Sequence, residues 1–461
     1  MTGERRESLR SKLRSGRFRI GVWGLGFIGY STIAHFANEG TRCIGYDVDP
    51  DVVQQTQNGE IPVSDLEYWL GFDTRSLVED GLIEATTDAD EILSDDVLVH
   101  FLAIPTERDG EPWEGALRET AERLAAYAEI DTEEPVLVIV ESTLTPGMSD
   151  DVIFDAFESS GLEIGTDILV GVAPRRDWFI SPDKNLRSLP RVYGGQDART
   201  NERMESVLGI VCNNLVEAPD HHHAELVKSI ENAYRHVGIT LANQLSRAYT
   251  DIDMREVLQL VGTKWNIPTY YPSIGTGGYC IPLSSQYVLA GTDNPDELSI
   301  LHDTIETDRD QPRLTADALA AHGAESVAVL GFAYKGDVKV DILSPTKPIV
   351  DRLQEHGVSV AVNDPYYDDE YIEAETGAES ITFPAGLRGR DAVLIVADHQ
   401  KYKSIPHDRI LDAAETTTLV VDNQRTWEDL PLEDHGIEYY YTGAKGWLGP
   451  AMKDRPAARP E

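Results

Sequence analysis

The segment GLGFIG, residues 24–29, constrains the fold of this chain more than any other feature. An apolar run at residues 18–23 precedes it, and a helix-like stretch at residues 30–38 follows it. A second apolar run, residues 43–46, then ends at Asp47. The order strand, glycine turn, helix, strand and acid predicts a dinucleotide-binding βαβ unit. A glycine-rich turn in some other α/β protein is the alternative.

The same segment predicts the cofactor. Its glycines permit a tight turn in which backbone N–H groups approach a pyrophosphate at the start of a helix. Asp47 can accept hydrogen bonds from both hydroxyls of an adenosine ribose and would repel a 2′-phosphate, so NAD is favoured over NADP. The residues expected to line the cofactor here are Gly24, Gly26, Phe27, Ile28, Gly29 and Asp47.

The composition indicates a large acidic globular protein. The chain has 461 residues, enough for two or three domains, and 80 acidic against 40 basic residues give a net charge of −40. This charge argues against a nucleic-acid partner and suits a halophilic protein, since concentrated salt screens the self-repulsion. No apolar run approaches the roughly 18 residues needed to cross a membrane, and no signal peptide is visible, so we expect a cytoplasmic protein.

Apolar runs divide the chain into three domains. Consecutive rather than alternating apolar residues indicate strands buried on both faces, and hence a mostly parallel sheet under helices. We expect α/β domains at residues 18–205 and 323–445, a helical domain at 206–322, and flexible tails at 1–17 and 446–461. The expected strands cover residues 20–23, 43–46, 97–104, 136–141, 168–173, 191–193, 327–330, 358–362, 392–397 and 418–421. The expected helices outside the first βαβ unit cover 224–250, 298–322 and 348–356, with a loop at 264–283.

Neither the cysteines nor the histidines predict a metal site. The three cysteines, Cys43, Cys212 and Cys280, are far apart and form no CxxC pair, as in a reducing compartment. The run His221–His223 could suggest a metal, but adjacent residues on a forming helix point in different directions. We therefore interpret it as a solvated run before a helix that begins near Ala224.

Cys280 is the candidate nucleophile. It follows the glycine loop at residues 275–278, where a thiol can approach a ligand closely and backbone N–H groups can stabilise its thiolate. Lys228 and Asn232 are four residues apart on an expected helix, so they share a face and can stabilise a developing oxyanion. With NAD, these groups suggest oxidation of an alcohol to an aldehyde, capture as a thiohemiacetal, oxidation to a thioester, and hydrolysis. The mechanism requires the sulfur and the ammonium to converge beside the nicotinamide ring.

The chain resembles the nucleotide-sugar 6-dehydrogenases, which act on UDP-glucose, UDP-N-acetylmannosamine and GDP-mannose. The Cys-Ile-Pro form of the nucleophile motif looks more like the N-acetylhexosamine branch. The resemblance covers residues 18–445 and rests on the segments GLGFIG (24–29), IPT (104–106), EST (141–143) with PG (146–147), ELVK (225–228) with Asn232, GYCIP (278–282), GFAYK (331–335) and NDP (363–365).

The resemblance implies roles for most of these residues. Cys280 would be the nucleophile, Lys228 and Asn232 would stabilise the oxyanion and orient the sugar, and Thr143 would position a water or the nicotinamide end. The helical middle would form the core of a homodimer or larger homo-oligomer, and the third domain would hold the nucleotide. The resemblance also adds Thr106 to the residues expected to contact the cofactor. The implied substrate contacts are Lys228, Asn232, Gly277, Gly278, Tyr279 and Lys335.

Three positions depart from the family pattern. Arg175 replaces a Glu associated with thioester hydrolysis, Ser284 replaces an Asp that assists proton transfer, and Ile342 replaces an Arg that contacts the nucleotide sugar. Arg175 and Arg176 could instead bind an extra carboxylate or phosphate of the substrate, or be surface charges beside a loop. A regulatory paralogue without full turnover is therefore a second interpretation. A two-electron β-hydroxyacid dehydrogenase is a third, disfavoured by the Cys280 loop and the third domain.

Overall fold

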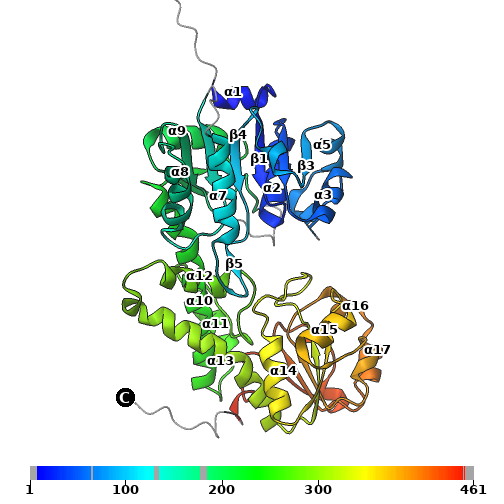
Figure 1. Cartoon of the computed structure of the whole chain (residues 1–461). Coiled ribbons are helices and arrows are strands. Elements are labelled where there is room, and N and C mark those ends of the chain that lie inside the picture. Colours follow the sequence, from blue (N-terminus) through cyan, green and yellow to red (C-terminus); the bar gives the residue numbers. More distant parts are fainter. Residues whose placement is uncertain (1–7, 64–65, 129–133, 177–183, 450, 452–461) are drawn as a thin grey trace, which may run out of the picture. The chain divides into compact units, whose positions relative to one another are not determined.

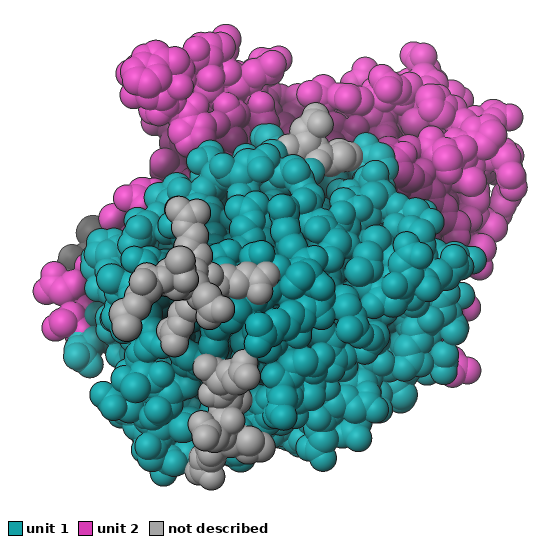
Figure 2. Space-filling view, turned by 90° about the horizontal axis from the view of Figure 1, so that it is seen from above, with its two compact units in different colours: residues 1–231, 290–293 teal, residues 232–289, 294–461 magenta. Residues whose placement is uncertain are grey.

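The computed structural model describes residues 8–63, 66–128, 134–176, 184–449 and 451. By its internal contacts the chain divides into two compact units, coloured separately in Figure 2. The first unit comprises residues 1–231 and 290–293, and the second comprises residues 232–289 and 294–461.

An eight-stranded sheet forms the centre of the first unit (Figure 1), in the order β10-β9-β8-β7-β4-β1-β2-β3. All neighbouring strands are parallel except β8 and β9. The strands are β1 (Arg19–Trp23), β2 (Cys43–Tyr46), β3 (Ile83–Thr86), β4 (Val97–Leu102), β7 (Val136–Val140), β8 (Ile168–Val172), β9 (Arg191–Gly195) and β10 (Leu215–Glu217), beside the small antiparallel pair β5 (Glu107–Arg108) and β6 (Glu111–Pro112).

Helices cover both faces of this sheet. Ile33 and Phe36 of α2 join one core cluster with Val22 of β1, whereas Leu117 and Leu124 of α7 join a second cluster on the opposite face. The predicted buried parallel sheet is therefore confirmed. The helices are α2 (Phe27–Asn38), α3 (Pro50–Gln57), α4 (Leu66–Leu70), α5 (Arg75–Glu79), α6 (Ala89–Ile92), α7 (Gly115–Ala128), the π-helix η1 (Ser149–Phe154), α8 (Asp155–Ser159) and α9 (Ala198–Leu208).

The prediction of a flexible tail at residues 1–17 is wrong for the part that the structure describes. Residues Leu9–Arg14 form helix α1, whose Leu9 and Leu13 are buried in the core cluster that contains residues of α9. Lys12 forms an ion pair with Glu134. The basic segment thus folds onto the acidic body because it carries apolar residues at helical spacing as well as charge.

One long helix, α10 (His221–Ala248), begins in the first unit and continues into the second. It starts three residues earlier than the sequence predicts. The helices α11 (Met254–Val261), α12 (Ile281–Ala290), η2 (Pro295–Leu298) and α13 (Ser299–Ala321) follow it. The predicted helix at 298–322 is confirmed as α13. Helix α11, which lies before the expected loop at 264–283, is additional, and α12 begins inside that loop.

A six-stranded parallel sheet forms the centre of the second unit, in the order β13-β12-β11-β14-β15-β16. Its strands are β11 (Ser326–Leu330), β12 (Ser359–Asn363), β13 (Glu379–Ser380), β14 (Ala392–Ile395), β15 (Leu419–Asp422) and β16 (Glu438–Tyr441). Its helices are α14 (Thr346–Glu355), α15 (Asp369–Thr376), η3 (Ala385–Leu387), α16 (Gln400–Ser404), α17 (His407–Ala413) and η4 (Glu433–His435).

The predicted tail at 446–461 also begins too early. Trp447 and Leu448 are buried in the core cluster of the second sheet, and the carbonyl oxygen of Trp447 lies 3.0 Å from Nε2 of His322. Residues 450 and 452–461 lie outside the described residues. Among the helices of the described segments, none is long and apolar enough to span a bilayer.

Candidate active site

The glycine turn of the first unit has the geometry that its sequence predicts. Gly24 has φ +85°, and a methyl group on Gly29 would lie 1.8 Å from the carbonyl oxygen of Gly24, so the turn requires glycine at both places. Helix α2 begins after Gly26, which has no side chain with which to cap the first N–H groups. These N–H groups are therefore available to an anion such as a pyrophosphate.

The carboxylate of Asp47 is fixed beside this turn. Its Oδ2 accepts a hydrogen bond from the N–H of Leu25 at 2.7 Å, and its Oδ1 accepts one from Asp49 at 3.0 Å. Asp47 directly follows β2, so the acid and the glycine turn meet at the carboxyl ends of adjacent strands. This is where open α/β sheets bind nucleotides, and the residues fit an NAD adenosine.

Thr106 and Thr143 meet at the same edge of the sheet. They follow β4 and β7, and the Thr106 hydroxyl donates a hydrogen bond to the carbonyl oxygen of Thr143 at 2.6 Å. Ser142 joins the two loops again, accepting from the N–H of Ile104 at 3.0 Å and donating to its carbonyl oxygen at 2.7 Å. The structure thus brings the predicted cofactor residues of the first unit to one edge.

Arg175 lies inside the first unit, with 2% of its surface exposed. Its guanidinium donates to the hydroxyls of Ser31 and Thr32 on α2, and lies 3.9 Å from the fully buried carboxylate of Glu141. Arg191 pairs with the same carboxylate. Arg175 therefore shares a buried charge with a second arginine and positions α2, whereas Arg176 pairs with the partly exposed Glu231.

Glu225 makes a contact that the sequence does not reveal. It is buried one turn after the start of α10, and its carboxylate accepts hydrogen bonds from the N–H groups of Gly147 at 3.0 Å and Ser149 at 2.9 Å. This contact joins the helix that carries Lys228 to the loop after Thr143. Lys228 itself is partly buried on α10, one turn before Asn232.

In the second unit, Cys280 is exposed at the end of its glycine loop. Gly278 has φ +77° and packs against the ring of Tyr334, where a methyl group would lie 2.7 Å from the ring. The N–H of Gly278 donates to the carbonyl oxygen of Ile342 at 2.8 Å. Burial, followed by the electrostatic effect of Cys280, raises the pKa of Tyr334 to about 12, so this phenol stays neutral at physiological pH.

A chain of hydrogen bonds connects Asn232 to the Cys280 loop. The Asn232 amide donates to the Ser284 hydroxyl at 3.1 Å, and that hydroxyl donates to the carbonyl oxygen of Cys280 at 2.6 Å. Both Asn232 and Ser284 are buried. Ser284 thus fixes the first turn of α12 and the orientation of Asn232. This differs from the proton transfer that the resemblance implies for an Asp at this position.

A second network supports the same loop, and sequence reasoning missed it. Asp308 of α13 accepts hydrogen bonds from the N–H of Thr276 at 3.0 Å and from its hydroxyl. His236 of α10 lies 3.3 Å from Asp308 and 2.9 Å from the hydroxyl of Ser285. These residues come from three helices and a loop, so no local spacing connects them.

Lys335 is held on a loop that a buried carboxylate orders. Asp364 accepts hydrogen bonds from the N–H groups of Phe332 at 2.8 Å and Ala333 at 2.9 Å. His399 lies 3.0 Å from the same carboxylate. Desolvation lowers the pKa of Lys335, although Asp398 and Asp337 oppose the shift. Gly277 and the exposed Tyr279 lie on the Cys280 loop of the same unit.

The fold and the residues at the strand ends define a dinucleotide-binding protein with an accessible thiol in a second α/β unit. Sequence comparison then identifies the family. The chain belongs to the UDP-glucose/GDP-mannose dehydrogenase family: the family's NAD binding domain matches residues 18–210, its central domain matches residues 222–308, and its UDP binding domain matches residues 328–429. It is accordingly an NAD-dependent dehydrogenase.

Individual relatives are distant but cover nearly the whole chain. A UDP-N-acetyl-D-mannosamine dehydrogenase of Methanococcus aeolicus is 24% identical, over 93% of this chain and 96% of its own. One of Pyrococcus horikoshii is 26% identical, over 85% and 92%. The solved UDP-D-ManNAc dehydrogenase of Pyrococcus horikoshii matches with a TM-score of 0.79 at 24% identity, covering 93% of this chain and all of that one. A UDP-glucose dehydrogenase of Pyrobaculum islandicum matches with a TM-score of 0.79 at 22% identity, covering 94% and 99%. These structures share the fold.

Proposed function

We propose that the protein oxidises the C6 alcohol of a UDP-sugar to the uronic acid with NAD, through thiohemiacetal and thioester intermediates on Cys280. Relatives named UDP-N-acetyl-D-mannosamine dehydrogenase favour a UDP-linked N-acetylhexosamine as the sugar. The observation that carries the proposal is the exposed Cys280 on a glycine loop joined through Ser284 to Asn232.

The reaction takes two oxidations. NAD bound at the glycine turn would supply the hydride acceptor for both oxidations. In the first, the C6 alcohol loses a hydride and a proton to give an aldehyde. The Cys280 sulfur adds to the aldehyde carbon, and the oxygen takes up a proton to give a thiohemiacetal. Loss of a second hydride and a proton leaves the thioester, and water then releases the acid and the thiol. One alcohol, two NAD⁺ and one water thus give one carboxylate, two NADH and three protons.

The roles proposed for the other residues follow from the hydrogen-bond donors and the charges of their side chains. Lys228 and Asn232 stabilise the oxygen that becomes negative during addition and hydrolysis. Thr143, paired with Thr106, positions a water or the nicotinamide end. Lys335 takes the nucleotide end of the substrate, together with Tyr279, Gly277 and Gly278 of the nucleophile loop. The buried contacts of Arg175 favour a supporting role beneath α2 over the predicted contact with the sugar.

The proposal also covers the oligomeric state of the protein, its cellular location and the use of its product. Large apolar side chains are exposed on the second unit's helices α10 and α11 and the loop that follows, including Tyr234, Leu241, Leu260 and Trp265. Such a surface supports a homodimer or larger homo-oligomer formed through the central helices. We also propose a halophilic cytoplasmic protein that supplies uronic acids for polysaccharide biosynthesis, with domain boundaries near residues 205 and 322.

A panel of nucleotide sugars tests the function. Purified protein in high salt is given NAD and each of several UDP- and GDP-sugars, and NADH is measured against sugar consumed. The expected result is two NADH per sugar for at least one UDP-sugar. The Cys280→Ser variant should form no acid, whereas Cys212→Ser, at a buried cysteine of the first unit, should keep the stoichiometry. No turnover with any sugar would contradict the proposal.

A catalytically impaired paralogue is the second candidate. The specific observation in its favour is that Arg175, at the position of the family's hydrolytic Glu, is held by Ser31 and Thr32. Ser284 and Ile342 also lack the family's charges. Calorimetry that finds NAD and UDP-sugar binding without turnover would favour this candidate. Activity gained from a low base in Ser284→Asp would then assign the loss to that position.

A further inference from the structure

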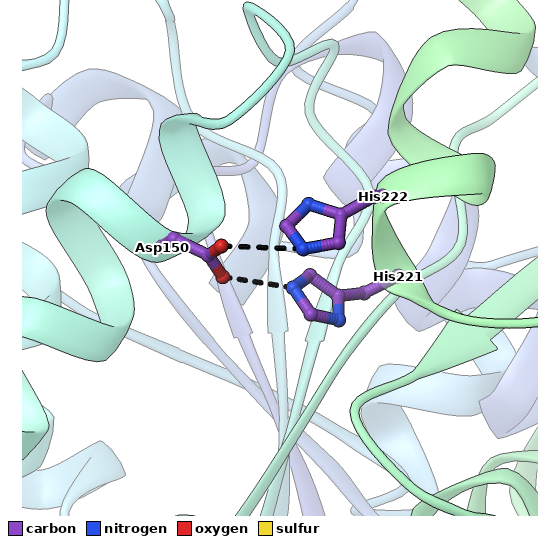
Figure 3. Close-up of side chains that lie close together, drawn as sticks. All are labelled: Asp150, His221 and His222. Carbon is purple, nitrogen blue, oxygen red and sulfur yellow. Dashed lines mark hydrogen bonds and ion pairs between the residues drawn. The ribbon is translucent and has the colours of Figure 1, made fainter.

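Two histidines and an aspartate converge outside the site described above. Asp150 lies in the π-helix η1, and His221 and His222 begin helix α10 (Figure 3). Nε2 of His221 lies 2.8 Å from one carboxylate oxygen of Asp150, and Nε2 of His222 lies 3.3 Å from the other. The two imidazole rings lie side by side, with centroids 4.0 Å apart.

This arrangement corrects an expectation from the sequence. Adjacent histidines at a helix start were expected to diverge, yet His221 and His222 face the same carboxylate. His223 does diverge, and its Nδ1 lies 2.7 Å from Asp220. The difference arises because η1 places Asp150 against the first turn of α10, a contact that the spacing of the histidines does not reveal.

We propose that Asp150, His221 and His222 bind a divalent first-row transition-metal ion such as Zn²⁺ or Co²⁺. One ligand atom from each residue lies within 4.8 Å of the others. Tetrahedral Zn²⁺ with bonds of about 2.1 Å requires neighbouring ligand atoms about 3.4 Å apart, so side-chain movements of about 1 Å complete the site. Two imidazoles and one carboxylate select such ions over Mg²⁺ or Ca²⁺, which prefer oxygen ligands.

The surroundings favour a cation and leave it an open position. His221 and Asp150 line a cleft of about 670 Å³ with Asp151, Asp155 and Glu158, whose charges offset the positive end of α10. Arg118 opposes them in part, at 3.6 Å from Asp155. Because the cleft is open, water can complete the coordination.

Metal binding would fix the protonation of both imidazoles. A metal at Nε2 requires each imidazole to be neutral and protonated at Nδ1: a ring that carries its single proton on Nε2 transfers it to Nδ1 through water, and an imidazolium releases its Nε2 proton to water. His222 is half exposed, so water can accept its Nδ1–H. Nδ1 of His221 is buried and meets no hydrogen-bond partner among the described residues, with or without metal at Nε2.

A bound ion would fasten the first turn of α10 to η1. Glu225, one turn later, already joins α10 to the N–H groups of Gly147 and Ser149. The metal would add a second link on the same side of the first unit, and its role would be structural and separate from hydride transfer.

Titration of the full-length, tag-free protein with Co²⁺ and Zn²⁺ tests the proposal. We expect one ion per chain, a tetrahedral or five-coordinate Co²⁺ spectrum, and no sulfur-to-cobalt charge-transfer band, which would indicate Cys280. Asp150→Asn and His222→Gln should each weaken binding at least about tenfold. His223→Gln, the matched change one residue further on, should bind as the wild type does. His222 is half exposed, so its variant should fold normally.

Thermal unfolding gives an independent readout. Zn²⁺ at a hundredfold excess over its Kd should raise the Tm of the wild type and of His223→Gln by at least about 2 °C, and chelation should reverse the rise. Asp150→Asn and His222→Gln should not respond. Equal binding by all four proteins, or equal binding of Mg²⁺ and Zn²⁺, would overturn the proposal and assign the cations to the acidic surface.

Discussion

At the scale of single residues, the carboxylate of Asp47 is hydrogen-bonded to the glycine turn, and we propose that it also holds the adenosine ribose of NAD. Asp47→Asn should weaken NAD binding about 10- to 100-fold, because a charge-assisted hydrogen bond contributes roughly 1.5–3 kcal/mol. The discrimination against NADP should fall as well, since the repulsion of a 2′-phosphate disappears. Fluorescence titration with both cofactors measures the two effects.

Asp49→Asn is the matched control, because Asp49 caps the exposed start of α3 and receives the N–H of Asp51. It should keep the NAD affinity of the wild type. An unchanged affinity and preference in Asp47→Asn would show that the acid does not contact the ribose.

The buried charges around Glu141 make Arg175→Glu a destabilising change. The new carboxylate would face Glu141, which is 0% exposed, with Arg191 left as the partner of both. A buried charge without its partner costs about 3–5 kcal/mol, so a large fall in Tm is expected. Restoring the family's Glu at this position should therefore not restore activity.

Arg176→Glu is the control for that variant, because its pair with Glu231 is partly exposed and should contribute no more than about 1 kcal/mol. Calorimetric unfolding of both variants measures their stabilities, and Arg175→Glu should be the less stable of the two. Equal stability of the two would mean that Arg175 is not buried as described.

At the scale of elements, helix α13 supports the Cys280 loop through the hydrogen bonds between Thr276 and Asp308. Thr276→Val removes the hydroxyl that donates to Asp308 and leaves a buried carboxylate with one donor fewer. We expect a loss of about 1–3 kcal/mol and faster amide hydrogen exchange in residues 273–280. Thr263→Val, at an exposed turn after α11, should change neither quantity. Exchange that stays slow in Thr276→Val would argue against this support.

Helix α1 belongs to the core of the first unit. Leu13 is fully buried, so Leu13→Ala should cost about 2–4 kcal/mol and make the segment before β1 susceptible to limited proteolysis. Ser11→Ala, on the exposed side of the same short helix, should have little effect. If Leu13→Ala unfolds like the wild type, α1 is dispensable.

The elements also show how far the sequence could predict this fold. Strands in the sheet interior, such as β4 and β7, are apolar except for His100 of β4 and were predicted within two residues at each end. The edge strands β3, β10 and β16 were missed because polar groups interrupt their pattern: Glu84 of β3, for example, pairs with Arg19. The short helix α11 was missed for a different reason: Met254, Val257, Leu258 and Val261 follow helical spacing, but eight residues give only about two turns, too few for a clear helical period.

In the candidate site, likewise, some residues could be predicted from the sequence and others could not. Glycines at 24–29 and 275–278, and the thiol after them, were visible because the chain itself forces their conformation. The partners of Arg175, Glu225 and Asp308 were not, because each contact joins segments tens of residues apart. Local patterns predict which groups a site contains, whereas tertiary packing decides what each group touches.

At the scale of the whole molecule, the net charge of −40 makes stability depend on salt. The screening length falls from about 10 Å at 0.1 M to about 3 Å at 1 M, which weakens repulsion among surface carboxylates. Tm should rise steadily between 0.1 and 2 M KCl. The largest rise is expected below 1 M, where screening changes most, and differential scanning calorimetry measures it. A Tm that is constant or falls with salt would remove the argument for a halophilic protein.

The unequal burial of the three cysteines has a practical consequence. Cys43 and Cys212 are buried, which raises the pKa of each thiol, whereas Cys280 is open to solvent. A maleimide added to the native protein should thus label position 280 alone. Compounds that bind against Cys280 should slow that labelling, so a mass spectrometer can screen for the physiological sugar before any turnover has been observed.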